Sequence, residues 1–190
     1  MKYPTIKKNK SQKNNNKSNL GMSLEKDINI TNKFYLDNQI AFIYKNPIPI
    51  QIVKVSYPSR NKAKITEAYF RKEALPDYHG LYKGKYITFD VKETNCKTSY
   101  PFSNIPIHQI KHLQQINNNE GLAFFIVHFK INDKYFLVPI NLIIEYLEKG
   151  FKSIKYKILL NNNLNISFQY NNPRINYLKI VDQLLTKLSK

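Results

Sequence analysis

The chain has 190 residues, about the length of one domain with a hydrophobic core, and a formal net charge of +17 from 30 Lys and Arg against 13 Asp and Glu. Its single cysteine, Cys96, excludes an intramolecular disulfide and a zinc cluster built from cysteines, and no apolar run reaches the roughly 18 residues of a transmembrane helix. The basic excess predicts a polyanionic partner, first nucleic acid and second an anionic membrane surface. We expect a cytoplasmic protein with no membrane anchor.

The first 20 residues contain hardly any apolar side chains and consist mainly of Lys, Asn, Ser and Gln. This composition predicts a disordered basic tail over residues 1–20. The tail either contacts phosphates or only keeps the chain soluble, and the sequence favours neither. Its lysines are Lys7, Lys8, Lys10, Lys13 and Lys17.

Residues 21–190 are expected to form a single domain. It begins with a helix from the N-cap Ser23 to about Leu36 and a short apolar strand over residues 39–44. Residues 46–72 contain two extended segments joined by a turn rich in Pro, Ser and Asn, which predicts a long projecting hairpin, called the arm below. Basic side chains in and beside the arm are Lys45, Lys54, Arg60, Lys62, Lys64, Arg71 and Lys72.

Further along the chain, apolar periodicity predicts strands at 85–92, 121–129 and 135–140 and helices at 107–115, 142–147 and 174–188. The run at 121–129 is apolar throughout, which is typical of a central strand buried on both faces. This order of elements predicts an α/β fold in which helices flank a mixed sheet, rather than a doubly wound parallel sheet.

The strand at 85–92 carries an acid-x-Lys pattern. Alternation along the strand places Asp90 and Lys92 on one face, roughly 7 Å apart. Asp77 lies thirteen positions earlier. Two carboxylates that hold a divalent cation and a lysine that faces the scissile phosphate are the minimal arrangement of a metal-dependent nuclease, and oxygen ligands favour Mg²⁺, with Mn²⁺ as the alternative. The competing interpretation is a solvated strand face with a surface ion pair.

Other ionisable residues have weaker claims on a site. Four further acids are simpler to interpret as solvated or capping carboxylates than as metal ligands or a base; they are Glu25, Asp27, Glu67 and Glu73. His108 and His112 have the i, i+4 spacing of a zinc pair, but no Glu completes a His-Glu-x-x-His motif. A surface pair is the simpler interpretation of these histidines.

Taken in order, several segments resemble the RecU family of Holliday junction resolvases. One segment is Asp77-Tyr78-His79-Gly80, and another is Pro49-Ile50-Gln51-Ile52-Val53. The others lie at 21–28, 57–58, 67–71, 82–87, 92–94, 108–110 and 173–175. Together they extend over roughly residues 20–185, which makes this resemblance more specific than the acid-x-Lys pattern.

The resemblance implies a restriction-endonuclease-like core of the PD-(D/E)xK type, a homodimer, and a basic stalk, here the arm, that enters the junction. It also implies that Asp77, Asp90 and Gln109 bind magnesium and that Lys92 stabilises the transition state. The chain departs from the family at two positions. Asp90 replaces the usual Glu, and Leu75 replaces a frequent Thr ligand, so that Leu75 could contribute only its backbone carbonyl.

By the same resemblance, Lys45 and Arg60 match stalk positions that engage junction DNA, and we expect Lys54, Lys62 and Arg71 to contact DNA as well. The prediction is therefore a Mg²⁺-dependent endonuclease that resolves Holliday junctions in recombination and DNA repair, with the recombinase and branch-migration machinery as further partners. A two-fold dimer would supply the two active sites that symmetric cleavage requires. Two alternatives remain open: a catalytically weak junction-binding or recombinase-modulating protein, and a generic basic RNA-binding protein.

Overall fold

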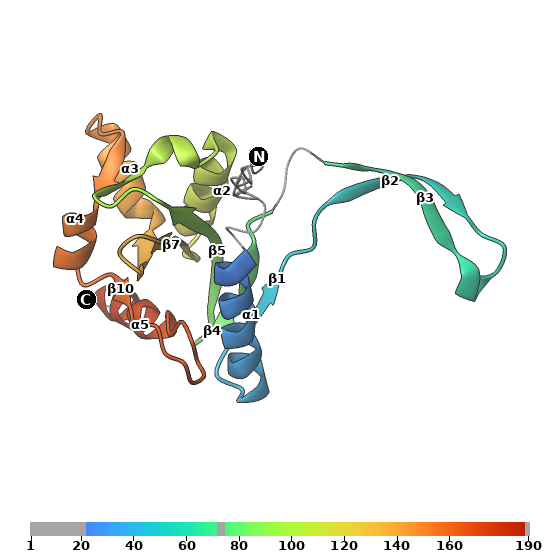
Figure 1. Cartoon of the computed structure of the whole chain (residues 1–190), viewed down its shortest axis with the longest axis horizontal. Helices are drawn as coiled ribbons and strands as arrows, with labels where there is room; N and C mark the ends of the chain where they lie inside the picture. Colours follow the sequence, from blue (N-terminus) through green and yellow to red (C-terminus); the bar gives the residue numbers. More distant parts are fainter. Residues whose placement is uncertain (1–21, 72–74, 189–190) are drawn as a thin grey trace, which may run out of the picture.

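The computed structural model describes residues 22–71 and 75–188 (Figure 1). The predicted basic tail and the side chains of Lys72 and Glu73 lie outside the described residues. Within the described part of the chain, no helix has the length and apolar character that crossing a bilayer requires. That residues 21–190 act as a single nuclease domain stays a prediction.

A six-stranded sheet forms the centre of the body, in the order β1-β4-β5-β7-β8-β10. Its strands are β1 (Phe42–Lys45), β4 (Tyr78–Tyr82), β5 (Lys85–Thr94), β7 (Leu122–Phe129), β8 (Lys134–Pro139) and β10 (Asn165–Ile166). β5 and β7 pair in parallel and the other neighbours are antiparallel, so the sheet is mixed, as predicted. Every residue of β7 is buried, as expected of a central strand.

Helices flank the sheet, which confirms the predicted α/β class (Figure 1). They are α1 (Met22–Asp37), α2 (Ile107–Asn118), α3 (Ile140–Glu148), α4 (Tyr156–Asn161) and α5 (Leu178–Leu188). α1 packs against β1 and β5, whereas α2 and α3 pack against β7. A second small sheet pairs β6 (Ser99–Pro101) with β9 (Ser153–Lys155).

A stack of aromatic rings holds β4, β5 and β7 together at the acidic residues. Tyr78 stacks on Phe89 with ring centroids 4.9 Å apart, and Phe89 stacks on Phe124 at the same distance. All three rings are fully buried. Because Tyr78 follows Asp77 and Phe89 precedes Asp90, the stack fixes the backbone next to both acids.

Gly80 allows β1 to lie close against β4. A Cβ at this position would be 2.0 Å from the carbonyl oxygen of Phe42 and 2.6 Å from the Cα of Ile43, well inside any contact distance. Only glycine therefore permits this approach of the two strands. As a result β1 ends at Lys45 beside the loop that carries Asp77, and the chain enters the arm from there.

The arm consists of β2 (Ile50–Ser56) and β3 (Lys64–Phe70), which pair only with each other and project from the body (Figure 1). The hairpin matches the prediction, and a 3-10 helix at Arg60–Lys62 lies in its turn. Every residue of both strands is exposed. Since a two-stranded hairpin with no covered face is marginally stable in water, we expect the arm to be covered by a partner when the protein acts.

The structure differs from the predictions at the C-terminal helix and at several strands. α5 begins at Leu178 rather than at residue 174, because Ile175 instead bridges to Phe168 and donates its backbone N–H to Thr31. The sequence pattern gives no sign of β4, where Gly80 interrupts the alternation. β6, β9 and β10 are two or three residues long, too short to produce a periodic signal.

Candidate active site

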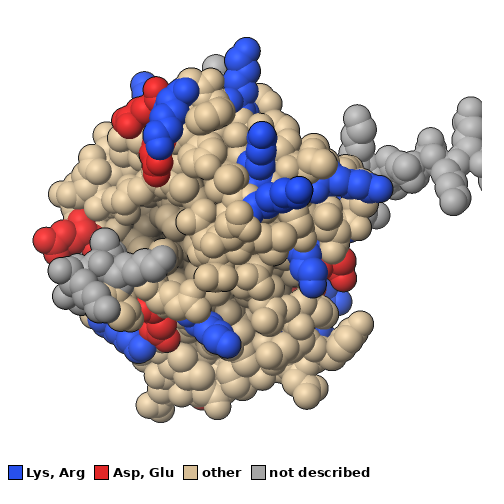
Figure 2. Space-filling view, turned by 90° about the vertical axis from the view of Figure 1, so that its left-hand side faces the viewer, with Lys and Arg blue, Asp and Glu red and all other residues tan. Residues whose placement is uncertain are grey.

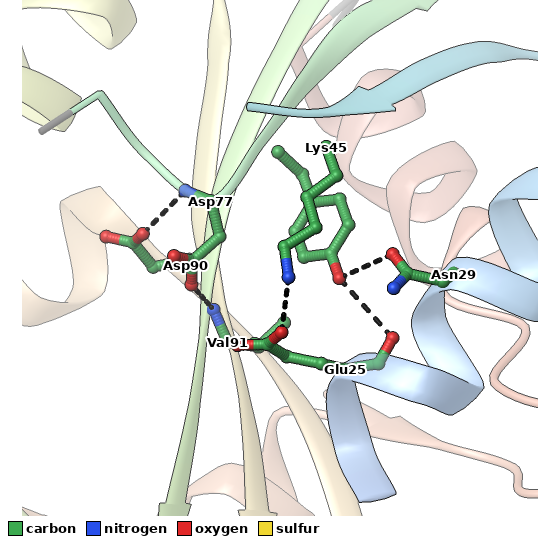
Figure 3. A network of polar contacts seen from close by, with 7 residues as sticks. Glu25, Asn29, Lys45, Asp77, Asp90 and Val91 are labelled. Carbon is green, nitrogen blue, oxygen red and sulfur yellow. Dashed lines mark hydrogen bonds and ion pairs between the residues drawn. The ribbon is translucent and has the colours of Figure 1, made fainter. Parts of the chain in front are cut away.

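Asp77 and Asp90 lie side by side on neighbouring elements. Asp77 is in the loop before β4, and Asp90 is in β5, which pairs with β4. The backbone N–H of Asp77 donates to Asp90 Oδ1 at 2.8 Å, and the backbone N–H of Val91 donates to Asp77 Oδ2 at 3.0 Å (Figure 3). The backbone at Asp77 therefore holds the Asp90 carboxylate, and the backbone next to Asp90 holds the Asp77 carboxylate.

Asp90 is fully buried, which argues against a solvated strand face. Burial, and after it the negative charge of Asp77, raises the pKa of the Asp90 carboxyl to about 6, although the charge of Lys92 opposes this shift. Asp90 Oδ2 has no hydrogen-bond partner among the described residues. A buried carboxylate with one unsatisfied oxygen beside a second carboxylate is an environment that a cation would stabilise.

Lys92 shares the sheet face of Asp90, because the two residues are two positions apart in β5. Tyr86 lies on the same face, because it is an even number of positions from Lys92 along β5. It lines a pocket with His112 and Ile116 of α2, so this face is turned towards α2. Lys92 is half-buried, and it takes part in no ion pair with another described residue. The charge of Lys92 acts on the Asp90 carboxyl, so its ammonium group lies near that acid.

Gln109 lies in the first turn of α2, and its Oε1 is buried without a hydrogen-bond partner in the described structure. Asp90 Oδ2 and Gln109 Oε1 are thus two buried acceptors that lack donors, one on the sheet and one on the helix facing it. A cation lying between the two oxygens would give each of them a partner. The described residues contain no metal-binding cluster of three or more His, Cys, Asp or Glu, so a site here would need the Gln109 amide as well as two carboxylates. An oxygen-only set of this kind fits Mg²⁺ or Mn²⁺.

Lys45 forms an ion pair with Glu25 of α1 beside the two acids (Figure 3). The hydroxyl of Tyr78 donates to Asn29 Oδ1 at 2.9 Å and to the backbone carbonyl of Glu25 at 3.4 Å. These contacts tie α1 to the point where the chain enters the arm. Twenty residues separate Glu25 from Lys45, so no local pattern in the sequence could reveal that they meet.

The predicted DNA-contacting residues of the arm are exposed, and Lys54 lies opposite Glu67 in the register of the hairpin. These arm cations form no salt bridge with any described residue. They are Lys54, Arg60, Lys62 and Arg71. By contrast, Figure 2 shows that on the body face opposite the arm, basic and acidic side chains are dispersed among one another. The arm is therefore a concentrated positive element.

Other candidates from the sequence lie outside this site. Asp27 pairs with Arg174 at 2.7 Å, and Glu67 accepts a hydrogen bond from the hydroxyl of Tyr69 on the arm. Leu75 is exposed, and a role for its backbone carbonyl in metal binding stays a prediction.

Comparison with known proteins places the chain among recombination proteins. A family model described as RecU, Recombination protein U, matches residues 19–183. A protein of Oceanobacillus iheyensis named Holliday junction resolvase RecU is 45% identical over 179 residues, covering 91% of each chain. Proteins of the same name from Staphylococcus epidermidis and Bacillus cereus are 45% and 43% identical, covering 87% and 88% of this chain and 81% and 85% of their own. Among solved structures, the Holliday junction resolvase Hjc of Archaeoglobus fulgidus covers 74% of this chain and 92% of its own at 12% identity, with a TM-score of 0.41.

Proposed function

Because the chain belongs to the RecU family, we propose that it is a Holliday junction resolvase, an endonuclease that cuts four-way DNA junctions in recombination and DNA repair. The observation that carries this proposal is the buried Asp90 carboxylate paired with the half-buried Asp77, with Lys92 on the same strand face as Asp90. A junction-binding protein without catalysis would have no use for a carboxylate buried at an energetic cost.

Asp77, Asp90 and Gln109 would hold the magnesium ion. When bound, the ion polarises a phosphoryl oxygen and lowers the pKa of an attacking water. Asp90 must be ionised for this role, and its pKa of about 6 in the metal-free protein means that metal binding is accompanied by proton release at and below about pH 6. Lys92 stabilises the negative charge that develops on the phosphorus centre during cleavage.

The arm carries the contacts that select a branched substrate. The arm projects beyond the body (Figure 1), and its exposed cations would reach DNA strands that leave the active site. Arg60 lies in the turn, so it would meet the branch point first. An arginine suits this position because its planar guanidinium both binds phosphates in a forked geometry and stacks on exposed bases.

The active form is a homodimer, because symmetric cleavage of two strands needs two sites related by a two-fold axis. An apolar patch on the sheet face that carries Lys92 supports this assignment. Its side chains, Phe42, Tyr44, Leu81 and Tyr86, are between 44% and 50% exposed in the isolated chain. A second copy of the chain would cover this patch, whose side chains are neighbours on adjacent strands and not scattered over the surface.

The test is incubation of the protein with a mobile four-way junction in Mg²⁺, followed by mapping of nicks on all four strands. Nicks at symmetric positions in two opposing strands are expected, together with their loss in Asp77→Ala while junction binding remains. Binding without cleavage by the wild-type protein would refute the proposal and favour a junction-binding protein, to which the Leu75 and Asp90 departures also point. Equal binding of junction and linear duplex, again without cleavage, would favour a generic nucleic-acid binder.

A further inference from the structure

Asn46 connects the arm to the loop that carries Asp77. It lies directly after β1, at the point where the chain leaves the body. Its side-chain Nδ2 donates to the carbonyl oxygen of Pro76 at 2.6 Å, and its backbone N–H donates to the carbonyl oxygen of Asp77 at 2.8 Å. Asn46 and Pro76 are thirty positions apart and the strands of the arm lie between them, so this contact closes the arm at its base.

The carbonyl of Pro76 and the N–H of Asp77 belong to the same peptide group. Asn46 binds the carbonyl end of that group, and Asp90 Oδ1 accepts from its N–H end at 2.8 Å. Because a peptide group is planar, fixing the direction of the carbonyl also fixes the direction of the N–H. Hydrogen bonds at both ends of one peptide also polarise and strengthen each other.

We propose that Asn46 is a positioning residue for the metal site, and that it couples the placement of the arm to the geometry of Asp77 and Asp90. Through the Pro76 peptide, Asn46 sets the direction of the N–H that holds the Asp90 carboxylate. A shift of the arm on DNA is passed to the acids through this contact. This inference rests on the proposed metal-dependent nuclease function, since it concerns the same two carboxylates.

The position of Asn46 supports a role beyond ordinary loop closure. The neighbouring Lys45 is held by Glu25, so both residues at the entry to the arm are anchored beside the acids. On the returning side, the backbone N–H of Arg71 donates to the carbonyl of Pro49 at 3.0 Å, which closes the hairpin itself without reaching the acids. Among the described residues, Asn46 thus provides the hydrogen bonds from the entry of the arm to the acidic loop.

The test compares Asn46→Ala and Asn46→Asp with Asn38→Ala. Asn46→Asp keeps the size of the side chain but replaces the N–H donor with an acceptor facing the Pro76 carbonyl. Asn38 is a matched control, because its Nδ2 also donates to a backbone carbonyl, that of Phe34 at 2.8 Å, at the end of α1. Hydrogen exchange at the Asp77 amide in metal-free protein, Mg²⁺ dependence of cleavage, and junction affinity in Ca²⁺ are measured for each variant.

In both Asn46 variants we expect faster exchange at the Asp77 amide and a Mg²⁺ requirement raised by about tenfold or more, the usual scale for outer contacts of a metal site. Cleavage at saturating Mg²⁺ should recover most of the wild-type rate, and junction affinity in Ca²⁺ should stay within about twofold, because Asn46 orients the acids and does not itself bind DNA. Asn38→Ala should match the wild type in all three measurements.

Two results would overturn the inference. The first is that the Asn46 variants show the same Mg²⁺ requirement for cleavage, and the same rate of hydrogen exchange at the Asp77 amide, as Asn38→Ala. The other is a loss of junction affinity as large as the loss of cleavage, which would make Asn46 an arm contact only. A wild-type protein that neither binds metal nor cleaves would refute the proposed function instead. In that case exchange at the Asp77 amide would still decide whether Asn46 orients the peptide.

Discussion

The backbone N–H of Asp77 holds one oxygen of the Asp90 carboxylate, whose other oxygen is buried without a partner. The pKa of Asp90 is raised from 3.8 to about 6 by burial and by the charge of Asp77. Between these values the metal-free folded protein keeps a proton that the unfolded chain has released. The contribution of Asp90 to the free energy of unfolding should therefore be largest below about pH 4. This contribution should fall as the pH rises through about 6.

The substitution Asp90→Asn should remove this pH dependence. With metal chelated at pH 7, we expect the variant to be more stable than the wild type by on the order of 2 kcal/mol, because no buried charge remains. Urea unfolding at several pH values measures both effects. Asp37→Asn is the control, since Asp37 forms an exposed ion pair with Lys33. Identical pH profiles for wild type and Asp90→Asn would contradict the raised pKa.

Lys92→Ala should lower cleavage by about 10²–10³-fold, the scale for removing one group that stabilises transition-state charge. Folding should be unchanged, because Lys92 has no ion-pair partner among the described residues, and metal binding should persist, because Lys92 is not a proposed ligand. Single-turnover cleavage of a junction measures the loss, with Lys134→Ala as the exposed control on the hairpin between β7 and β8. If junction affinity fell by the same factor as cleavage, Lys92 would be only a phosphate contact.

Gln109→Met should weaken metal binding without lowering the stability of the metal-free protein. Its buried Oε1 has no hydrogen-bond partner among the described residues, so removing it should leave the metal-free free energy of unfolding unchanged or slightly higher. Affinity for Mn²⁺, measured by calorimetry, should fall by about tenfold or more. The exposed Gln115 on the same helix provides the control Gln115→Met. Unchanged Mn²⁺ affinity in Gln109→Met would exclude Gln109 as a ligand.

Much of the site is visible in the sequence because strand alternation is local. Two-residue spacing alone places Asp90 and Lys92 on one face, and the turn residues between two extended segments predict the arm. What alternation cannot predict is the burial of Asp90, which depends on the tertiary packing around β5. The contacts of Asn46 and Glu25 are equally invisible, because each joins residues twenty or more positions apart.

Gly80→Ala should destabilise the protein by about 3 kcal/mol or more, because the new methyl group overlaps the backbone of β1 and neither strand can move freely. Gly84→Ala is the matched control. Gly84 has a φ of +75° with open space around its missing Cβ, so only backbone strain of about 1 kcal/mol is expected. Thermal unfolding compares the two variants. Equal losses would show that β1 does not depend on close contact at Gly80.

Arg60→Ala should weaken binding to a four-way junction much more than binding to linear duplex. The residue lies in the turn of the arm, where stacking on a base at the branch point would contribute about 1–3 kcal/mol, or roughly 5- to 150-fold in affinity. Arg60→Lys keeps the charge but loses the planar fork, so it should restore duplex binding and not junction binding. Titration of both substrates at two salt concentrations distinguishes the contributions, because a plain phosphate contact changes the salt slope on both DNAs alike. Lys62→Ala, in the same turn, is the control for charge alone. If Arg60→Ala lowered junction and duplex affinity by the same factor, the arm would act only as a patch of positive charge and would not recognise the branch.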